Sequence, residues 1–158
     1  MARPPAGSSH ALLDRGLLPG LLGYGLRRTQ SAVFADFAAT FANAGEALTP
    51  GEFGLLVLVE RNVGLSQMAL ARALGIDRST LVPILNRLQA RGLLVRHASP
   101  TDGRTHALAL TPSGEKALAR FAKLVRTHEK RIASGLSAAE TSTLIELLEK
   151  VRHAARAL

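Results

Sequence analysis

The 158-residue sequence contains no cysteine and no tryptophan, and tyrosine occurs only once. Without cysteine there is no disulfide framework, no thiolate zinc site and no thiol redox sensor. Long hydrophobic runs are also missing, because no segment approaches the roughly 20 apolar residues that cross a bilayer. The first ten residues are rich in Pro, Gly and Ser, and Asp14, Arg15 and Pro19 interrupt the apolar stretch that follows. No signal peptide is therefore expected, and we predict a cytoplasmic protein with a disordered tail over residues 1–11.

Acidic residues are also scarce, at 12 against 20 lysines and arginines, which gives a formal net charge of +8. Residues 1–64 hold five arginines and five acids, so their charges cancel. Residues 65–110 hold six arginines and two aspartates, and the remaining excess of four lies in 111–158. A positive field of this kind favours a polyanion as partner, with binding that weakens steeply with salt. Solvated helix faces are often basic as well, so charge alone does not identify that partner.

Residues 65–92 have the pattern of two short helices joined by a tight turn. Ser66 is a typical N-cap residue, and Gly75 is the residue type that closes a helix in the left-handed conformation. Asp77 follows as the expected cap of a second helix, which Gly92 ends. A turn of about three residues between two helices is what a helix-turn-helix requires.

The second of these helices leaves polar and basic residues on the face away from its apolar positions. The predicted contacts on it are Arg78, Ser79, Thr80, Pro83, Asn86 and Arg87, with Ser66 and Gln67 added from the start of the first helix. Such side chains donate to phosphates and to base edges in a major groove wide enough for one helix. Pro83 lacks the amide that would bond back to Ser79, which raises the question of whether the helix bends there.

A β-hairpin is predicted over residues 94–110, where alternating strands flank a turn rich in Pro, Asp and Gly. Arg104 is expected to project from the tip of this wing, with Asp102 orienting its guanidinium by a charge-assisted bond. An arginine held in this way suits a narrow minor groove. Arg96 and His97, on the first strand, complete the predicted DNA contacts.

Together these segments resemble the MarR family of bacterial winged helix-turn-helix transcriptional regulators. The resemblance rests on residues 65–80, then 88–96, then 100–104 leading into 110–114, in that order and spacing. It covers the chain from about residue 17 to the end. It implies a mainly α fold with a small β-hairpin wing, in which N- and C-terminal dimerisation helices flank the winged helix-turn-helix. The lack of cysteine excludes the peroxide-sensing branch of that family.

The resemblance divides the chain into four parts. After the tail of 1–11 come an N-terminal dimerisation helix within 12–48, the DNA-binding lobe over 49–110 with its wing at 94–110, and C-terminal dimerisation helices over 111–158. Capping boxes at Thr49–Glu52 and Ser137–Glu140 mark two further helix starts. A long first helix is expected from residue 17 to about residue 44.

Residues that are all apolar except His128 recur every three or four positions along two C-terminal stripes. These are Leu118, Phe121, Val125, His128 and Ile132, then Leu144, Leu148, Val151, Ala155 and Leu158. A stripe of this kind packs either on its own domain or on a partner helix. Two of them at the end of a small chain favour a homodimer.

The mechanism that the resemblance implies is repression of a promoter by a dimer bound to a palindromic operator. Two recognition helices in successive major grooves must lie about 34 to 36 Å apart. A small ligand that favours another spacing would release the DNA. The candidate ligand residues are Tyr24, Arg27, Arg28, Gln30, Phe34 and Phe37. An arginine beside aromatic walls suits an anionic, aromatic carboxylate or its acyl-CoA thioester. Alternatively, the phenylalanines belong to the core and the arginines contact the partner subunit or DNA.

Other classes of function find less support. His97 and His106 are candidates to pair across the hairpin, and His128 is expected to be a partly buried residue of its stripe, but none shows the spacing of a zinc site. We therefore predict no metal and no cofactor. The glycines at 16, 20, 23 and 25 follow no strand, and no catalytic constellation is visible, so we predict no enzyme. The strongest alternative is a winged helix that binds a protein instead of DNA, which salt-dependent binding to a random duplex would exclude.

Overall fold

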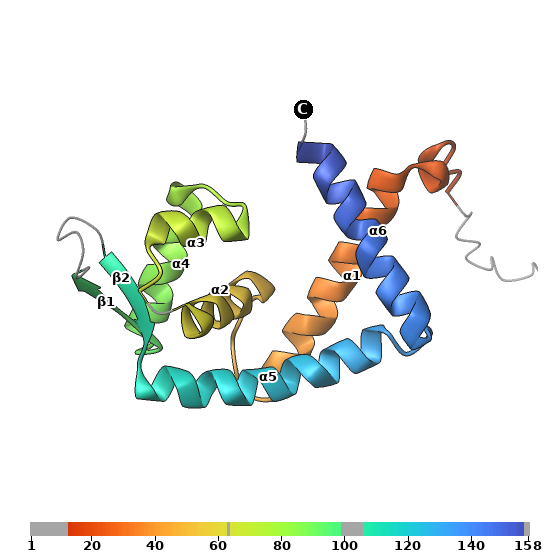
Figure 1. The fold of residues 1–158 in the computed structure, drawn as a ribbon. Helices are drawn as coiled ribbons and strands as arrows, with labels where there is room; N and C mark the ends of the chain where they lie inside the picture. The colour runs from red at the N-terminus through yellow and green to blue at the C-terminus, as the bar shows by residue number, and fades with distance from the viewer. Residues whose placement is uncertain (1–12, 63, 99–105, 157–158) are drawn as a thin grey trace, which may run out of the picture.

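The computed structural model describes residues 13–62, 64–98 and 106–156 (Figure 1). Within these ranges the chain forms six α-helices and one two-stranded antiparallel hairpin. The elements are a 3-10 turn at Leu18–Gly20, α1 at Leu22–Asn43, α2 at Pro50–Arg61, α3 at Gln67–Leu74, α4 at Arg78–Ala90, β1 at Leu94–Ala98, β2 at His106–Leu110, α5 at Pro112–Ile132 and α6 at Ala138–Arg156. The predicted disordered tail of 1–11 lies outside the described residues.

The helices and the hairpin are arranged in two groups along α5 (Figure 1). One group, which we call the lobe, consists of α2, α3, α4 and the β1–β2 hairpin. The other consists of α1 and α6, and α5 runs past both groups. The predicted class, mainly α with a small hairpin wing, is confirmed.

A continuous apolar core joins the lobe to α1 and α5. Phe37 and Phe41 of α1 stack with ring centroids 4.6 Å apart, and the Phe41 ring lies 5.7 Å from that of Phe121 on α5. Leucines from every element of the lobe complete this core and are fully buried: Leu55, Leu56, Leu70, Leu81, Leu85, Leu88, Leu94 and Leu108. This shared core holds the start of α5 firmly to the lobe.

The helix-turn-helix forms where the sequence predicts it. The hydroxyl of Ser66 accepts a hydrogen bond from the amide of Ala69, and Gly75 closes α3 with a φ of +66°. Asp77 occupies the N-cap position of α4, but the prediction that its side chain caps the helix is wrong. Its own backbone carbonyl instead receives the amides of Thr80 and Leu81.

The wing forms with the predicted strands. Leu94 lies opposite Leu110, and the amide of Leu108 donates to the carbonyl of Leu65, so β2 also ties the wing to the start of α3. The suggested pairing of two histidines across the hairpin is wrong, because His97 lies opposite Ala107 and not opposite His106. The tip lies outside the described residues.

The first long helix begins later than predicted. It starts at Leu22 and not at residue 17, because Leu18–Gly20 forms a separate 3-10 turn with Pro19 at its start. Leu21 has an extended backbone, with φ −91° and ψ 121°, so it ends the 3-10 turn and serves as the N-cap residue of α1. This extended residue separates the two helices.

The two C-terminal stripes have different fates. Leu118, Phe121 and His128 of α5 are buried within the chain itself, so the expectation that this stripe faces a partner is wrong for these residues. On α6, by contrast, no described residue is buried. The side chains of α6 that remain exposed include Leu144, Ile145, Leu147 and Leu148.

The turn that follows α4 packs so closely against the start of α5 that no side chain can be added there. Gly114, in the first turn of α5, is buried against the backbone of Leu93, and a methyl group built on it would overlap the Leu93 carbonyl oxygen. The hydroxyls of Thr111 and Ser113 both donate to the carbonyl of Gly92, which holds the two segments together.

Gly114→Ala should therefore destabilise the fold, because overpacking against rigid backbone costs about 1 to 3 kcal/mol. Urea unfolding should show a lower midpoint than that of the unmodified protein. Gly51→Ala is the matched control, since Gly51 lies in the first turn of α2 with no atom close to its added methyl group. Equal midpoints for the two variants would show that the α4–α5 junction adjusts freely.

Candidate functional site

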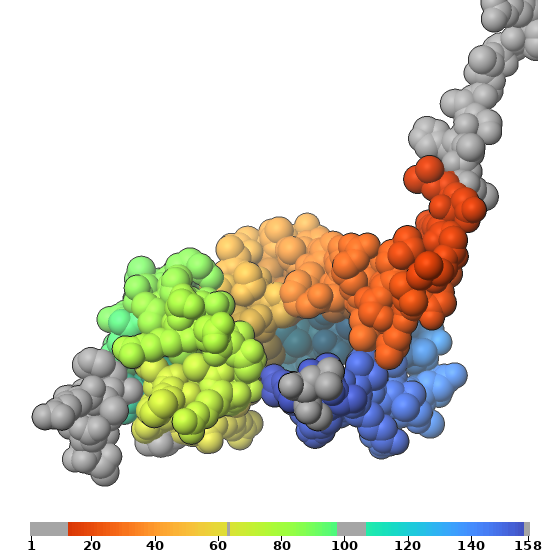
Figure 2. All heavy atoms as spheres, turned by 90° about the horizontal axis from the view of Figure 1, so that it is seen from above, coloured from red at the N-terminus to blue at the C-terminus, as the bar shows by residue number. Residues whose placement is uncertain are grey.

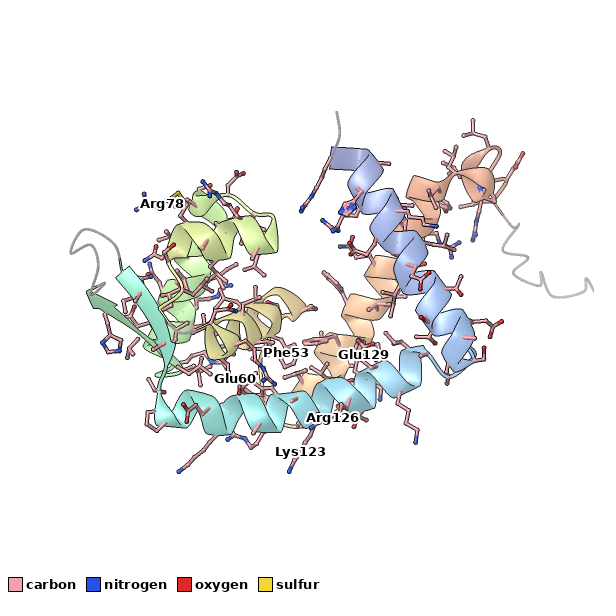
Figure 3. All side chains as sticks on the ribbon, in the orientation of Figure 1. Phe53, Glu60, Arg78, Lys123, Arg126 and Glu129 are labelled. Carbon is pink, nitrogen blue, oxygen red and sulfur yellow. The ribbon has the colours of Figure 1, made fainter. Side chains whose placement is uncertain are left out.

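The exposed face of α4 is the centre of the candidate nucleic-acid interface. One side of the helix is buried in the core through Leu81, Leu85 and Leu88. The opposite side presents Ser79, Pro83 and Asn86, all exposed. Arg78 lies at the end of α4 farthest from α5 and points into solvent (Figure 3). The helix continues through Pro83 without a break.

Arg96 of the wing fixes the orientation of Asn86. Its Nη2 donates to Oδ1 of Asn86 at 2.7 Å. Because a guanidinium only donates, the amide oxygen of Asn86 must face Arg96, which leaves the amide nitrogen as the donor toward solvent. The Nε of Arg96 is enclosed and has no hydrogen-bond partner among the described atoms. The wing and the recognition helix therefore form one surface.

Arg87 belongs to a different arrangement from the one predicted. Its Nε and Nη2 both donate to Oε1 of Glu52, at 3.2 and 3.1 Å. Glu52 is buried and also accepts from the amide of Thr49 in the predicted capping box, which is confirmed. Because Glu52 holds the guanidinium, Arg87 connects α4 to α2, and a contact of Arg87 with DNA stays a prediction.

The other predicted contacts surround this surface or lie beyond the described residues. Ser66 uses its hydroxyl as the cap of α3, and Gln67 next to it is partly exposed. Thr80 and His97 are exposed on α4 and β1. Asp102 and Arg104 lie outside the described residues, so the role of the wing tip stays a prediction.

A hollow of about 690 Å³ lies between α1 and the end of α5. Its lining residues are Pro19, Tyr24, Gly25, Arg28, Thr29, Ala32, Val33, Asp36, Arg131 and Ile132. The guanidinium carbons of Arg27 and Arg28 lie 5.6 and 5.7 Å from the centre of the Tyr24 ring, within cation–π range. This end of the molecule therefore offers an aromatic wall and positive charge.

Only part of the predicted ligand set meets at this hollow. Tyr24 and Arg28 line it, whereas Gln30 and Phe34 are exposed on α1 and do not. Phe37 is buried in the core against Phe41, so the prediction that it contacts a ligand is wrong. For Phe37 the alternative reading, a core residue, is the one observed.

Asp36 and Arg131, which both line the hollow, belong to a polar cluster. Asp36 of α1 accepts from both Nε and Nη2 of Arg131, each at 2.7 Å, and lies 2.6 Å from Nδ1 of His128. Arg131 also donates to the hydroxyl of Thr40. The hydrogen bond from Arg131, with that from His128, lowers the pKa of Asp36 to about 2. His128 itself is fully buried, whereas the sequence predicted partial burial.

The lowered pKa of Asp36 makes a prediction about acid stability. A carboxyl whose pKa falls on folding stabilises the folded state above its unfolded value near 4, and loses that contribution as the pH falls toward 2. Asp36→Asn should reduce the drop in urea midpoint between pH 5 and pH 2.5. Glu60→Gln, at an exposed carboxylate of α2, should keep the full drop. A drop in Asp36→Asn as large as that of the unmodified protein would contradict this role.

Sequence reasoning missed the partners of this cluster and of Arg87. The available signal was Asp36 itself, an isolated acid in the apolar second half of α1. In the part of the chain that the structure describes, no group of three or more His, Asp or Glu side chains is placed to hold a metal ion. None of the helices described there is both long enough and apolar enough to span a bilayer.

Comparisons with known proteins agree with this geometry. The model of the MarR family matches residues 48–105. A putative transcriptional regulatory protein for the hcr operon of Thauera aromatica is 45% identical over 147 residues, covering 93% of this chain and 88% of the relative.

Two solved structures are similar over almost the whole chain. The transcriptional repressor CouR bound to a 23-mer DNA duplex is 41% identical, with a TM-score of 0.84, covering 90% of this chain and 99% of that chain. CouR bound to p-coumaroyl-CoA is 40% identical, with a TM-score of 0.81, covering 93% and 100%. The similarity thus includes the terminal helices as well as the lobe.

Proposed function

Because the chain belongs to the MarR family of transcriptional regulators, we propose that it is a homodimeric repressor whose hold on DNA is released by a small aromatic ligand. The observation that carries this proposal is the surface formed by α4 and β1. There an exposed polar helix face lies beside the wing, with Asn86 oriented by Arg96. The partner in this proposal is chromosomal DNA, which implies a cytoplasmic location.

The dimer in this proposal is formed by the terminal helices. On α6, Leu144, Ile145, Leu147 and Leu148 are 41% to 59% exposed in the single chain. Exposed apolar residues continue at the start of the chain with Leu17, Leu18, Leu21 and Leu22 and with Phe34 of α1. Exposed apolar side chains gathered on one helix in this way favour an interface that a partner covers. A second copy of the chain supplies matching surface by two-fold symmetry.

The DNA contacts in this proposal divide by chemistry. Asn86 and Ser79 face base edges in the major groove, where the amide nitrogen of Asn86 donates to a base acceptor. Pro83 places an apolar ring between them, suited to a thymine methyl group. Arg78 and the predicted wing-tip Arg104 supply positive charge for phosphates or for the minor groove.

The ligand in this proposal occupies the hollow between α1 and α5. The Tyr24 ring provides a stacking surface, and Arg28 provides a charge-assisted donor for a carboxylate or phosphate. Arg131 neutralises Asp36 nearby, so an anion entering the hollow does not face a free carboxylate. CouR was solved with p-coumaroyl-CoA, which makes an aromatic acyl-CoA thioester the first ligand to test.

A selection and release experiment tests this function. Duplexes enriched from genomic DNA by the purified protein should share one palindrome, and their affinity should fall steeply with salt. p-Coumaroyl-CoA or p-coumarate should then displace the enriched duplex, whereas coenzyme A alone should not. Release by coenzyme A alone would show that the protein recognises the coenzyme A moiety and not the aromatic group.

The same experiment separates the alternative of a winged helix that binds protein. A protein-binding module would show no enriched palindrome and no salt-dependent affinity for random duplex at low ionic strength. That outcome would overturn the proposed function as a whole.

A further inference from the structure

We propose that Arg156, at the end of α6, fixes the orientation of the DNA-binding lobe by contacting the turn of the helix-turn-helix at Gly75. The inference rests on the proposed dimer, because it concerns how two lobes are held relative to each other. It assigns Arg156 a positioning role in operator recognition without requiring that Arg156 contact DNA.

The contact joins the end of the chain to the middle of the lobe. A methyl group built on Gly75 would overlap Nη2 of Arg156, with Cζ of the same side chain at 3.3 Å. The guanidinium therefore lies directly against the backbone of the turn between α3 and α4. Figure 1 shows α6 folding back from the far end of α5, and Figure 2 shows its C-terminal end against the lobe.

The chemistry of the turn favours a cation at this place. Gly75 ends α3, where the amides of Gly75 and Ile76 bond to carbonyls of the last helical turn. The C-terminal end of a helix carries partial negative charge, which attracts a cation. Asp77 follows in the same turn, and its carboxylate is not used as a helix cap. Glycine also lacks the side chain that would keep the guanidinium away from the backbone.

Through this contact α6 attaches to the lobe at a second place, away from α5. The lobe is otherwise attached through the start of α5 and through the connection from α1 to α2, which both lie on one side of it (Figure 1). Arg156 adds an attachment on the side of α3. Because α6 buries no described residue within its own chain, the proposed dimer interface holds this helix in place. Arg156 therefore links the dimer interface to the turn that precedes the recognition helix.

The consequence concerns the distance between the two recognition helices. A dimer reads two half-sites only when the helices are about 34 to 36 Å apart. A lobe that is attached on one side only can pivot about that attachment. The distance between the two recognition helices then varies over a range. With Arg156 in contact, we expect a narrow range and a strict preference for one spacing of half-sites.

The absence of cysteine makes this distance directly measurable. Gln89→Cys introduces one cysteine per subunit at the exposed end of α4, and a spin label is attached to it. Double electron–electron resonance between the two labels then reports the separation of the two lobes. The full-length dimer is measured without DNA, first alone and then with Arg156→Ala or Arg156→Gln added. Lys150→Ala is the matched control, because it removes one positive charge from an exposed position of the same helix.

Both Arg156 variants should widen the distance distribution at least twofold, while Lys150→Ala leaves it unchanged. A distribution as narrow as that of the unmodified protein, in a variant that is still dimeric by light scattering, would overturn the inference. So would a lower salt dependence of DNA binding with an unchanged distribution, since Arg156 would then contact phosphate directly.

The outcome is distinguishable from failure of the proposed function. A monomeric parent protein gives no dipolar signal, which would overturn both the dimer and the role of Arg156. A dimer that binds an enriched palindrome and keeps its distance distribution without Arg156 would overturn only the latter. Relaxed half-site spacing in the Arg156 variants, selected from duplexes with varied central length, is the supporting functional result.

Discussion

Replacing Leu148 with aspartate should convert the proposed dimer into a monomer. Leu148 is 41% exposed in the single chain and lies on the apolar face of α6, beside Leu144 and Val151 in the helical repeat. A partner helix that covers this face would enclose the new carboxylate. Burying an unpaired charge costs several kcal/mol, and two-fold symmetry applies this cost twice. Light scattering on the purified variant should give half the parent mass.

The control for this substitution lies on the opposite face of the same helix. Lys150 follows two residues later, about 200° around a helix of 3.6 residues per turn, and is exposed. Lys150→Asp also introduces a carboxylate but should leave the dimer intact. A Leu148→Asp protein that remains dimeric at micromolar concentration would show that α6 does not form the interface.

Loss of the dimer should remove tight operator binding as well. A monomer contacts one half-site, so it loses the contacts of the second recognition helix and wing. Every 1.4 kcal/mol of lost contact free energy is a factor of ten in affinity. We therefore expect Leu148→Asp to retain only weak, salt-sensitive binding to any duplex, without preference for the enriched palindrome.

Replacing Asn86 with alanine should have the second large effect, on sequence preference. Asn86 is exposed in the middle of the recognition face, and its amide nitrogen is the donor that Arg96 leaves free. A well-placed base contact discriminates by roughly 1 to 3 kcal/mol. Each dimer carries the substitution twice, so the loss is roughly 2 to 6 kcal/mol, or at least about 30-fold in affinity for the selected operator.

The change should be specific to sequence. Asn86 carries no charge, so affinity for random duplex and the salt dependence of binding should stay as in the parent. Gln89→Ala removes an amide side chain from the end of the same helix and should leave the preference intact. An Asn86→Ala protein that enriches the same palindrome with the same affinity would exclude this face of α4 from base recognition.

Arg96→Ala provides an independent check on the orientation of Asn86. Without the 2.7 Å bond from Arg96, the amide of Asn86 is free to turn. We expect part of the specificity loss of Asn86→Ala, together with a lower salt dependence if Arg96 also contacts phosphate. The double variant should then lose less than the sum of the two single variants, because the residues act as a pair.

Local chemistry explains why the sequence predicts so much of the lobe. The cap at Ser66, the left-handed Gly75 and the capping box of Thr49 and Glu52 each depend on hydrogen bonds within about four residues. The strands of the wing follow from alternation and a turn in the same way. The late start of α1 belongs to this class too, because the break depends on the local backbone at Leu21, two residues after Pro19.

Positions decided by distant packing behaved differently. Arg87 is a residue type that is common in DNA contacts, yet it pairs with Glu52, 35 residues earlier in the chain. His128 and Phe37 meet edge to face with ring centroids 5.3 Å apart, because α5 packs its stripe against α1. A helical repeat shows that a face is apolar but not what covers it.

The sequence by itself determined the order of the helices, the two-helix reading unit and the hairpin beside it, because short-range bonds and side-chain periodicity encode them. Only the tertiary structure decided which basic residues remain free and which are held by acids, and that the end of α6 reaches Gly75. Those outcomes depend on side chains that become neighbours only when the whole chain has packed. Spacing along the sequence carries no signal for such neighbours.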